Sequence, residues 1–213
     1  MEIMPDEKDY RSLYEQERVR YLQSQINTHF LYTTLESMRG MYAAHQDLGF
    51  RNALTRLAKL YRYCAQPGIW VSLEDEVQTT QSYHELISSI MRTSVALDFE
   101  IPDALLSRRV PRMMIQPMVE NALLHGFMHS SFSDGSIGVS AWADGEILEI
   151  MIENDGEGIA AETIVALNDA PAQDGAGVGF ANLRERIRLL YPQQGMIEIS
   201  SDGIRGAAVR IRL

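Results

Sequence analysis

The chain of 213 residues contains one cysteine, Cys64, and no long run of apolar residues. A single cysteine excludes an intramolecular disulfide and fits a reducing compartment. A membrane-spanning helix needs about 20 consecutive apolar residues, and neither such a run nor a secretory leader is found in this sequence. We therefore expect a cytoplasmic protein, with any membrane or sensor segment lying upstream of this chain.

Basic residues are also scarce, with 19 Lys and Arg against 29 Asp and Glu and a net charge of -10. This balance argues against a protein that coats nucleic acid, because such binding depends on Lys and Arg that neutralise phosphates. A single phosphate-bearing ligand stays compatible, since a metal ion and backbone N–H groups can supply the positive end of the interaction. With 46% apolar residues, the chain can bury a core.

The first third of the chain is expected to be helical. Residues 9–42 contain no proline, and apolar residues at helical spacing predict a second helix from Gln46 to Cys64. Pro67-Gly68 cannot continue a helix, so we predict a helical hairpin over residues 1–68 and a second domain over residues 69–213. The first helix has no fully polar face, which predicts that two copies pair as a four-helix bundle in a homodimer.

The second domain is expected to be of the α+β class. A third helix should start at Ser72, with Asp75 completing a variant capping box. Alternating apolar residues then predict strands that flank the turns Asp144-Gly145 and Asp202-Gly203. Further helices should start near Gln116 and Phe180. The pattern predicts a mixed, largely antiparallel sheet with helices on one face.

Two glycine-containing stretches are candidates for nucleotide binding. In "GAGVGFANLRER", three alternating glycines precede an amphipathic helix, where backbone N–H groups can approach phosphate oxygens. In "IENDGEGI", an amide or carboxylate at a strand end could pair with the exocyclic amine of adenine, and the glycines would admit the ring. Alone, each stretch is equally typical of a loop without a ligand. The residues concerned are Gly175, Gly177, Gly179, Asn154, Asp155, Gly156 and Gly158.

Two further stretches place polar residues on helices. In "MIQPMVENALLHGF", Asn121 and His125 follow Glu120 and share one helix face, and an Asn oxygen suits Mg²⁺ bound together with phosphates. The alternative is a solvated polar stripe. In "LQSQINTHFLYTTLESM", His29 is followed one turn later by Thr33. A neutral imidazole can act as a nucleophile toward phosphorus, although such a histidine is more often a packed core residue.

The four stretches together, from Leu22 to Leu213, resemble the sensor histidine kinases of the LytS/YehU type, whose ATP-binding domain belongs to the GHKL superfamily. The resemblance implies a GHKL-type α/β sandwich, ATP and Mg²⁺ as cofactors and a response regulator as partner. It implies His29 as phospho-acceptor assisted by Thr33, Glu120 as the nearest candidate base and Asn121 as Mg²⁺ ligand. The other residues implied at the nucleotide are His125, Asn154, Asp155, Gly156, Gly158, Gly175, Gly177, Gly179, Asn182 and Arg186.

The chain departs from the family pattern at four positions. Thr28 replaces a proline before the histidine, Thr33 replaces an asparagine, Asn154 stands where the family commonly has aspartate, and Ala207 replaces a threonine. None of these changes removes Mg²⁺ or phosphate binding. They leave open an alternative, in which the chain is a nucleotide-binding GHKL signalling protein with weak or no histidine kinase activity.

Overall fold

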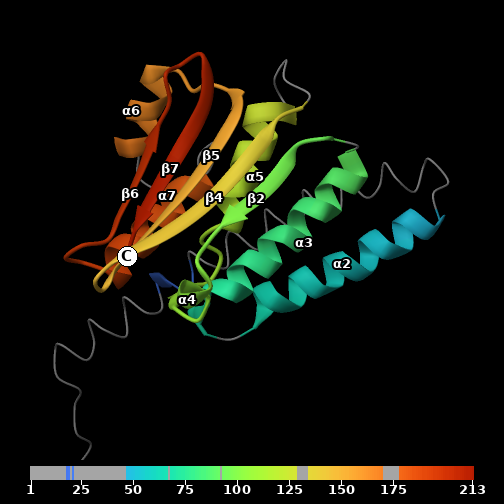
Figure 1. Ribbon diagram of the computed structural model, residues 1–213, viewed down its shortest axis with the longest axis horizontal. Helices are drawn as coiled ribbons and strands as arrows, with labels where there is room; N and C mark the ends of the chain where they lie inside the picture. Colours follow the sequence, from blue (N-terminus) through green and yellow to red (C-terminus); the bar gives the residue numbers. More distant parts are fainter. Residues whose placement is uncertain are drawn as a thin grey trace, which may run out of the picture.

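The computed structural model of the 213-residue chain describes residues 18–19, 21, 47–66, 68–91, 93–128, 134–169 and 178–213 (Figure 1). Residues 18, 19 and 21 are helical. The candidate residues Thr28, His29, Thr33, Gly175 and Gly177 lie outside the described part of the chain.

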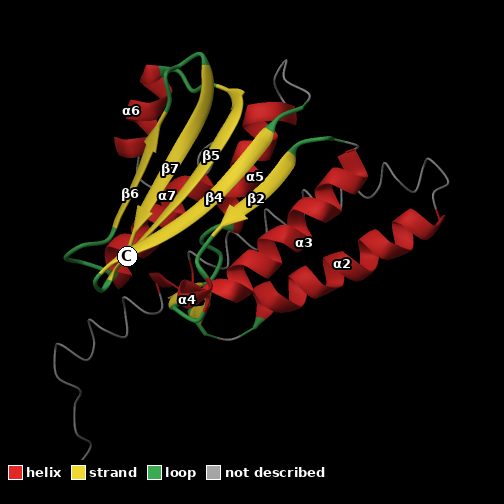
Figure 2. Ribbon diagram, viewed as in Figure 1, coloured by secondary structure: helices red, strands yellow, loops and turns green. Residues whose placement is uncertain are grey.

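A five-stranded sheet forms the centre of the C-terminal part, in the order β2-β4-β5-β7-β6. Strand β2 runs parallel to β4, and the other neighbouring pairs are antiparallel. Helices cover one face of the sheet, as Figure 2 shows. The predicted α+β class with a mixed, largely antiparallel sheet is therefore confirmed. The strands are β2 (Ala96–Glu100), β4 (Ser136–Asp144), β5 (Ile147–Glu157), β6 (Met196–Ser200) and β7 (Arg205–Arg212).

The core lies between the sheet and helices α5 (Gln116–Leu123) and α7 (Val178–Leu190). Alternate residues of the strands point toward these helices, because successive side chains of a strand face opposite sides. Buried Ile150 of β5 and Ile211 of β7 are paired neighbours in this layer. Helix α6 (Ala161–Asp169), which was not predicted, packs beside β6 and α7.

Helices α2 (Asp47–Ala65) and α3 (Leu73–Met91) run side by side next to the sheet (Figure 1). The helix predicted from Gln46 to Cys64 is thus confirmed within a residue at each end. The capping box at the start of α3 is also confirmed, because the Asp75 N–H donates to Ser72 Oγ at 3.1 Å and the Ser72 N–H donates to Asp75 Oδ2 at 3.1 Å.

Three short elements lie between α2 and α5. Strands β1 (Trp70–Ser72) and β3 (Arg109–Pro111) form a separate antiparallel pair, and α4 (Asp103–Leu106) precedes β3. The sequence did not predict them, because strands of three residues and a helix of four are too short to show their apolar period. No described helix is long and apolar enough to cross a membrane.

Both predicted hairpins are present. In the first, Asp144 pairs with Ile147, so the two-residue loop is Gly145-Glu146, one position later than predicted. Gly145 has φ +59°, a conformation that favours glycine in such a loop. In the second hairpin, the Asp202 carboxylate accepts hydrogen bonds from the N–H groups of Ile204 and Arg205. The predicted helix starts near Gln116 and Phe180 are confirmed as well.

Candidate nucleotide site

Helix α5 carries the polar motif that was predicted to bind Mg²⁺, and it lies against the first turn of α7. Asn121 is half-buried, and its Nδ2 lies 3.6 Å from the position that a Cβ on Gly179 would occupy. Gly179 is the last glycine of the glycine-rich stretch and the second residue of α7. The structure thus brings two of the predicted nucleotide-binding elements into contact.

The C-terminal end of α5 meets the turn at the end of β5. Residues Leu124–Met128 form a π-helical turn, η1, of the kind that often marks functional sites. A Cβ on Gly126 would lie 2.9 Å from Asn154 Oδ1, and a Cβ on Gly156 would lie only 2.3 Å from the Gly126 carbonyl oxygen. The third predicted element is therefore packed directly against the second.

This packing changes the role expected for two glycines. We expected Gly156 and Gly158 to leave room for an adenine ring. At Gly156 that room is taken by the backbone of Gly126, and a Cβ on Gly158 would lie 2.6 Å from the Ile204 nitrogen. The missing side chains allow the turn to approach η1 and the β6–β7 loop.

Asn154 is held by the surrounding backbone through both ends of its amide. Its Oδ1 accepts a hydrogen bond from the Gly156 N–H at 3.1 Å, and its Nδ2 donates to the Ala207 carbonyl oxygen at 3.3 Å. An amide has two N–H donors and two acceptor lone pairs, so each end retains capacity for one more bond. A purine base can use such a donor and acceptor pair.

Asp155 contacts other segments than Asn154 does. Its Oδ1 accepts a hydrogen bond from the Ser136 N–H at 2.7 Å, and its Oδ2 lies 3.7 Å from Arg205 Nη2. These contacts hold the β5 turn to the start of β4. Asp155 therefore has a local structural partner on each oxygen, while Asn154 faces the Gly126 side.

Glu120 and His125 differ sharply in exposure. His125 is exposed. Glu120 is 5% exposed, and burial raises its pKa to about 7. The charge of Glu120 adds to the burial that raises the pKa of Tyr83, a residue of α3, and α3 packs against α5. Glu120 therefore faces the core between α5 and α3.

Asn182 and Arg186 follow the glycine-rich stretch and were expected at the nucleotide, but both are fully buried. The Arg186 guanidinium donates to the carbonyl oxygens of Met113, at 3.1 Å, and Arg112. The structure thus places Arg186 in the packing of α7 against the segment before α5. Sequence reasoning had also missed Glu76, whose buried carboxylate binds the same segment.

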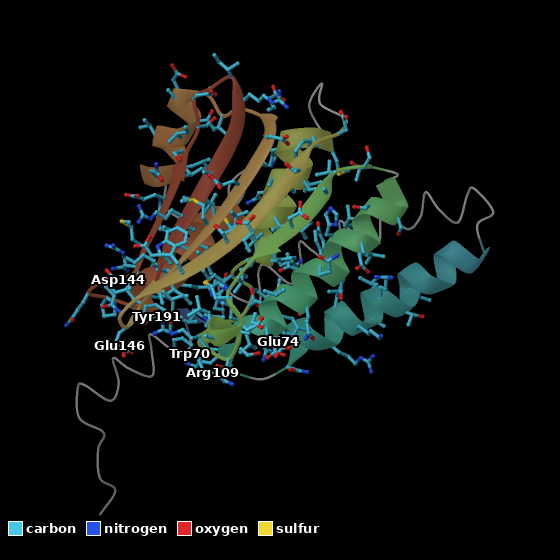
Figure 3. All side chains as sticks on the ribbon, viewed as in Figure 1. Trp70, Glu74, Arg109, Asp144, Glu146 and Tyr191 are labelled. Carbon is cyan, nitrogen blue, oxygen red and sulfur yellow. The ribbon has the colours of Figure 1, made fainter. Side chains whose placement is uncertain are left out.

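The opposite end of the sheet carries a different group of side chains. Trp70 and Tyr191 meet edge to face with their ring centroids 5.9 Å apart. Figure 3 shows these residues near the tip of the β4–β5 hairpin, where Asp144 and Glu146 lie. Asn154 and Gly156 stand near the other end of β5, so this aromatic pair is separate from the candidate nucleotide site.

Two family models match the chain. The histidine kinase family matches residues 17–94, and the family of histidine kinase-, DNA gyrase B-, and HSP90-like ATPases matches residues 107–213. Sensor protein LytS of Oceanobacillus iheyensis is 24% identical over 198 residues, which cover 90% of this chain and 33% of that protein. LytS of Streptococcus mutans is 28% identical over 86% of this chain and 32% of that protein. The chain spans about a third of the length of these curated relatives.

Solved structures agree on the fold. The histidine kinase domain of the blue-light activated kinase EL346 of Erythrobacter litoralis has a TM-score of 0.51 and 18% identity, covering 94% of this chain and 95% of that one. The Acinetobacter baumannii histidine kinase AdeS has a TM-score of 0.52 and 15% identity, covering 99% and 86%. The chain belongs to the family of histidine kinase-, DNA gyrase B-, and HSP90-like ATPases, and it has the paired family domains of a LytS-type sensor histidine kinase.

Proposed function

We propose that this chain is an ATP-dependent protein-histidine kinase of a two-component signalling system. It binds ATP with Mg²⁺, phosphorylates its own His29 and passes the phosphoryl group to an aspartate of a response regulator. The chain acts as a homodimer formed through its N-terminal helical hairpin. The observation that carries the proposal is the convergence of Asn121, the start of α7 at Gly179 and the Asn154 turn around η1.

The residues present fit ATP and Mg²⁺. The Asn121 amide oxygen is a hard ligand of the kind that Mg²⁺ accepts, and no described group of three or more His, Cys, Asp or Glu side chains is arranged to hold a metal. A single protein ligand is compatible with Mg²⁺, which is often held largely by substrate phosphates and water. The N-terminus of α7 supplies backbone N–H groups and a partial positive charge for phosphate. Asn154 would hold the base through its remaining donor and acceptor.

Phosphoryl transfer at such a site depends on positioning and charge neutralisation. Mg²⁺, when bound, neutralises charge on the phosphates. The neutral His29 imidazole attacks the γ-phosphorus, the bond from that phosphorus to the β–γ bridging oxygen breaks, and ADP leaves. The imidazole proton is released from the ring. Glu120, the candidate base by motif, is buried, so its carboxyl must become accessible if it is to accept this proton.

One observation favours a second function, a nucleotide-binding signalling protein with weak or no kinase activity. Asn154 occupies the base-binding position, and it donates to the Ala207 carbonyl while accepting from the Gly156 N–H. A carboxylate there would offer only acceptors to the exocyclic amine of adenine, whereas an amide divides its capacity between donors and acceptors. The remaining amide acceptor would bind the exocyclic amine less strongly than a charged carboxylate does, and nucleotide binding would be weaker.

Incubation with γ-labelled ATP and Mg²⁺ separates the two functions. The kinase predicts an acid-labile, base-stable phosphoprotein that is absent in His29→Gln, while His29→Gln still binds a non-hydrolysable ATP analogue. Nucleotide binding without label in the wild-type protein supports the signalling protein without kinase activity. Label that persists in His29→Gln assigns the chemistry to another residue, and absence of nucleotide binding refutes both functions.

A further inference from the structure

The segment that leads from β3 into α5 has an unusual backbone. Met113 has φ +59°, in the left-handed region, and it is the only described residue other than glycine with a positive φ. This conformation turns the N–H groups of Met113, Met114 and Ile115 toward one side, which creates a concave site for an anion. A methionine does not favour this conformation by itself, so contacts from outside the segment must hold it.

Glu76 of α3 supplies the anion. Its side chain is 1% exposed, and its carboxylate accepts from the N–H groups of Met113, Met114 and Ile115 at 2.6, 2.8 and 2.9 Å. These donors belong to the residues just before α5, which begins at Gln116. A carboxylate at this position satisfies N–H groups that lack helical partners and interacts favourably with the positive end of the helix dipole.

Arg186 of α7 holds the same segment from its carbonyl side. The fully buried guanidinium donates to the carbonyl oxygens of Met113 and Arg112. Burial lowers the pKa of Arg186 to about 10, opposed by the charge of Glu76, so the side chain is still a cation at neutral pH. Two charges of opposite sign, from α3 and α7, thus enclose residues 112–115. We call this arrangement the α5 clasp.

Helix α2 is fastened to the α5 clasp at its last turn. The Tyr63 hydroxyl donates to Glu76 Oε1 at 2.5 Å, and the burial of Tyr63 beside Glu76 raises its pKa, so the hydroxyl keeps its proton. The Arg112 guanidinium donates to the carbonyl oxygens of Tyr63 and Gln66 and lies 5.1 Å from the centre of the Tyr63 ring. The clasp therefore connects the end of α2 with α5 and α7.

The α5 clasp joins α5 and α7, the two helices that meet at the candidate nucleotide site. It fixes the start of α5 relative to α7, and the same two helices come together again where Asn121 meets Gly179. We propose that Glu76 and Arg186 are positioning residues for nucleotide binding, which hold Asn121 at the N-terminal end of α7 without contacting the nucleotide. This inference rests on the proposed function, because it takes the site around Asn121 to bind Mg²⁺ and ATP.

The test compares two buried carboxylates. Glu76→Gln disrupts the α5 clasp, and Glu149→Gln is the matched control, since Glu149 is 4% exposed and accepts from Arg210 Nε at 2.6 Å and Arg212 Nε at 3.0 Å near the other end of β5. Affinity for a non-hydrolysable ATP analogue with Mg²⁺ is measured well below the unfolding temperature of every variant. We expect Glu76→Gln to bind about tenfold more weakly than wild type, and Glu149→Gln to bind within about twofold of it.

Arg186→Lys provides a second, independent variant. A lysine keeps the charge but cannot donate to two carbonyl groups with the planar geometry of arginine. We expect it to weaken binding too, and the double variant with Glu76→Gln to lose less binding free energy than the two single losses combined, because both residues hold one segment. A loss of stability alone would not reduce the affinity of the folded protein.

Each outcome has one meaning. If the wild-type protein does not bind the analogue, the proposed function fails. If the wild-type protein binds and both Glu76→Gln and Arg186→Lys bind as tightly as Glu149→Gln, the inference fails and the proposed function stands. If Glu76→Gln does not fold, Arg186→Lys decides by the same comparison with Glu149→Gln.

Discussion

Replacing Gly156 with alanine tests whether the close approach of the β5 turn and η1 shapes the nucleotide site. The new Cβ would lie 2.3 Å from the Gly126 carbonyl oxygen, 2.7 Å from its carbonyl carbon and 2.9 Å from its Cα. All three are backbone atoms, so no side chain can rotate away. Ordinary contact would require the two segments to separate by about 1 Å.

The expected cost follows from this geometry. Overpacking in a closely packed region costs about 1–3 kcal/mol, and a rigid backbone on the opposing side favours the upper end of that range. For a protein of this size, about 3 kcal/mol lowers the unfolding temperature by about 6–12 °C. Because Asn154 Oδ1 accepts from the Gly156 N–H, we also expect the affinity for Mg²⁺-ATP to fall by about tenfold or more.

Gly138→Ala is the matched control, because nothing lies within 4 Å of the Cβ position on this β4 residue. Calorimetric unfolding and an ATP-analogue titration should show Gly138→Ala close to wild type. The reasoning is refuted if Gly156→Ala matches Gly138→Ala in both unfolding temperature and nucleotide affinity, since the turn would then tolerate separation from η1.

Three further variants test other parts of the structure. His84 is 8% exposed with Nε2 2.9 Å from the Val95 carbonyl oxygen, and burial lowers its pKa. We expect the free energy of unfolding of the wild type to fall as the pH drops below about 6.5, because the unfolded histidine then binds a proton. In denaturant titrations, this dependence on pH should vanish in His84→Gln. Burial of Glu149 opposes its ionisation, yet hydrogen bonds and charge from two arginines lower its pKa. Glu149→Gln should lower the free energy of unfolding by about 1–2 kcal/mol at neutral pH. Chemical unfolding should show that difference from wild type shrinking as the pH falls below about 4.5. Asn121→Ala should leave the unfolding temperature of the free protein nearly unchanged, but should lose the roughly 2.7 kcal/mol of stabilisation that a hundredfold excess of nucleotide over Kd gives to the wild type.

Local signals predicted much of the fold. Ser72 and Asp75 stand three residues apart before an apolar pattern, and the structure shows their reciprocal hydrogen bonds. The hairpin at Gly145 was predicted from neighbouring residues as well, although its loop lies one residue later because cross-strand pairing extends to Ile147. Such features depend on residues close in the sequence, so a sequence pattern is enough to predict them.

Roles that depend on contacts between distant parts of the chain could not be predicted from the sequence. Arg186 follows a glycine-rich stretch and resembles a ligand-binding residue, yet its partners are backbone carbonyls 73 and 74 positions away. Glu76 is one of three consecutive acidic residues at the start of α3, and only the tertiary structure distinguishes it as buried. A backbone N–H or carbonyl group has no residue-specific signature, so side chains that bind backbone are hard to predict from sequence.

The α5 clasp contacts one end of the continuous helix formed by α5 and η1, and the β5 turn at Gly156 contacts the other end. This arrangement predicts how the effects of variants at the two ends combine. The Ile115 N–H donates to Glu76 in the clasp, and Gly126 contacts Gly156. These two contacts lie about 16 Å apart along the axis of α5 and η1. Effects at that separation without shared partners are usually additive. We therefore expect Glu76→Gln combined with Gly156→Ala to lose the sum of the two single losses in nucleotide-binding free energy. Marked non-additivity in a titration would mean that α5 and η1 respond as one deformable body, and the two ends could not then be treated as separate anchors of the site.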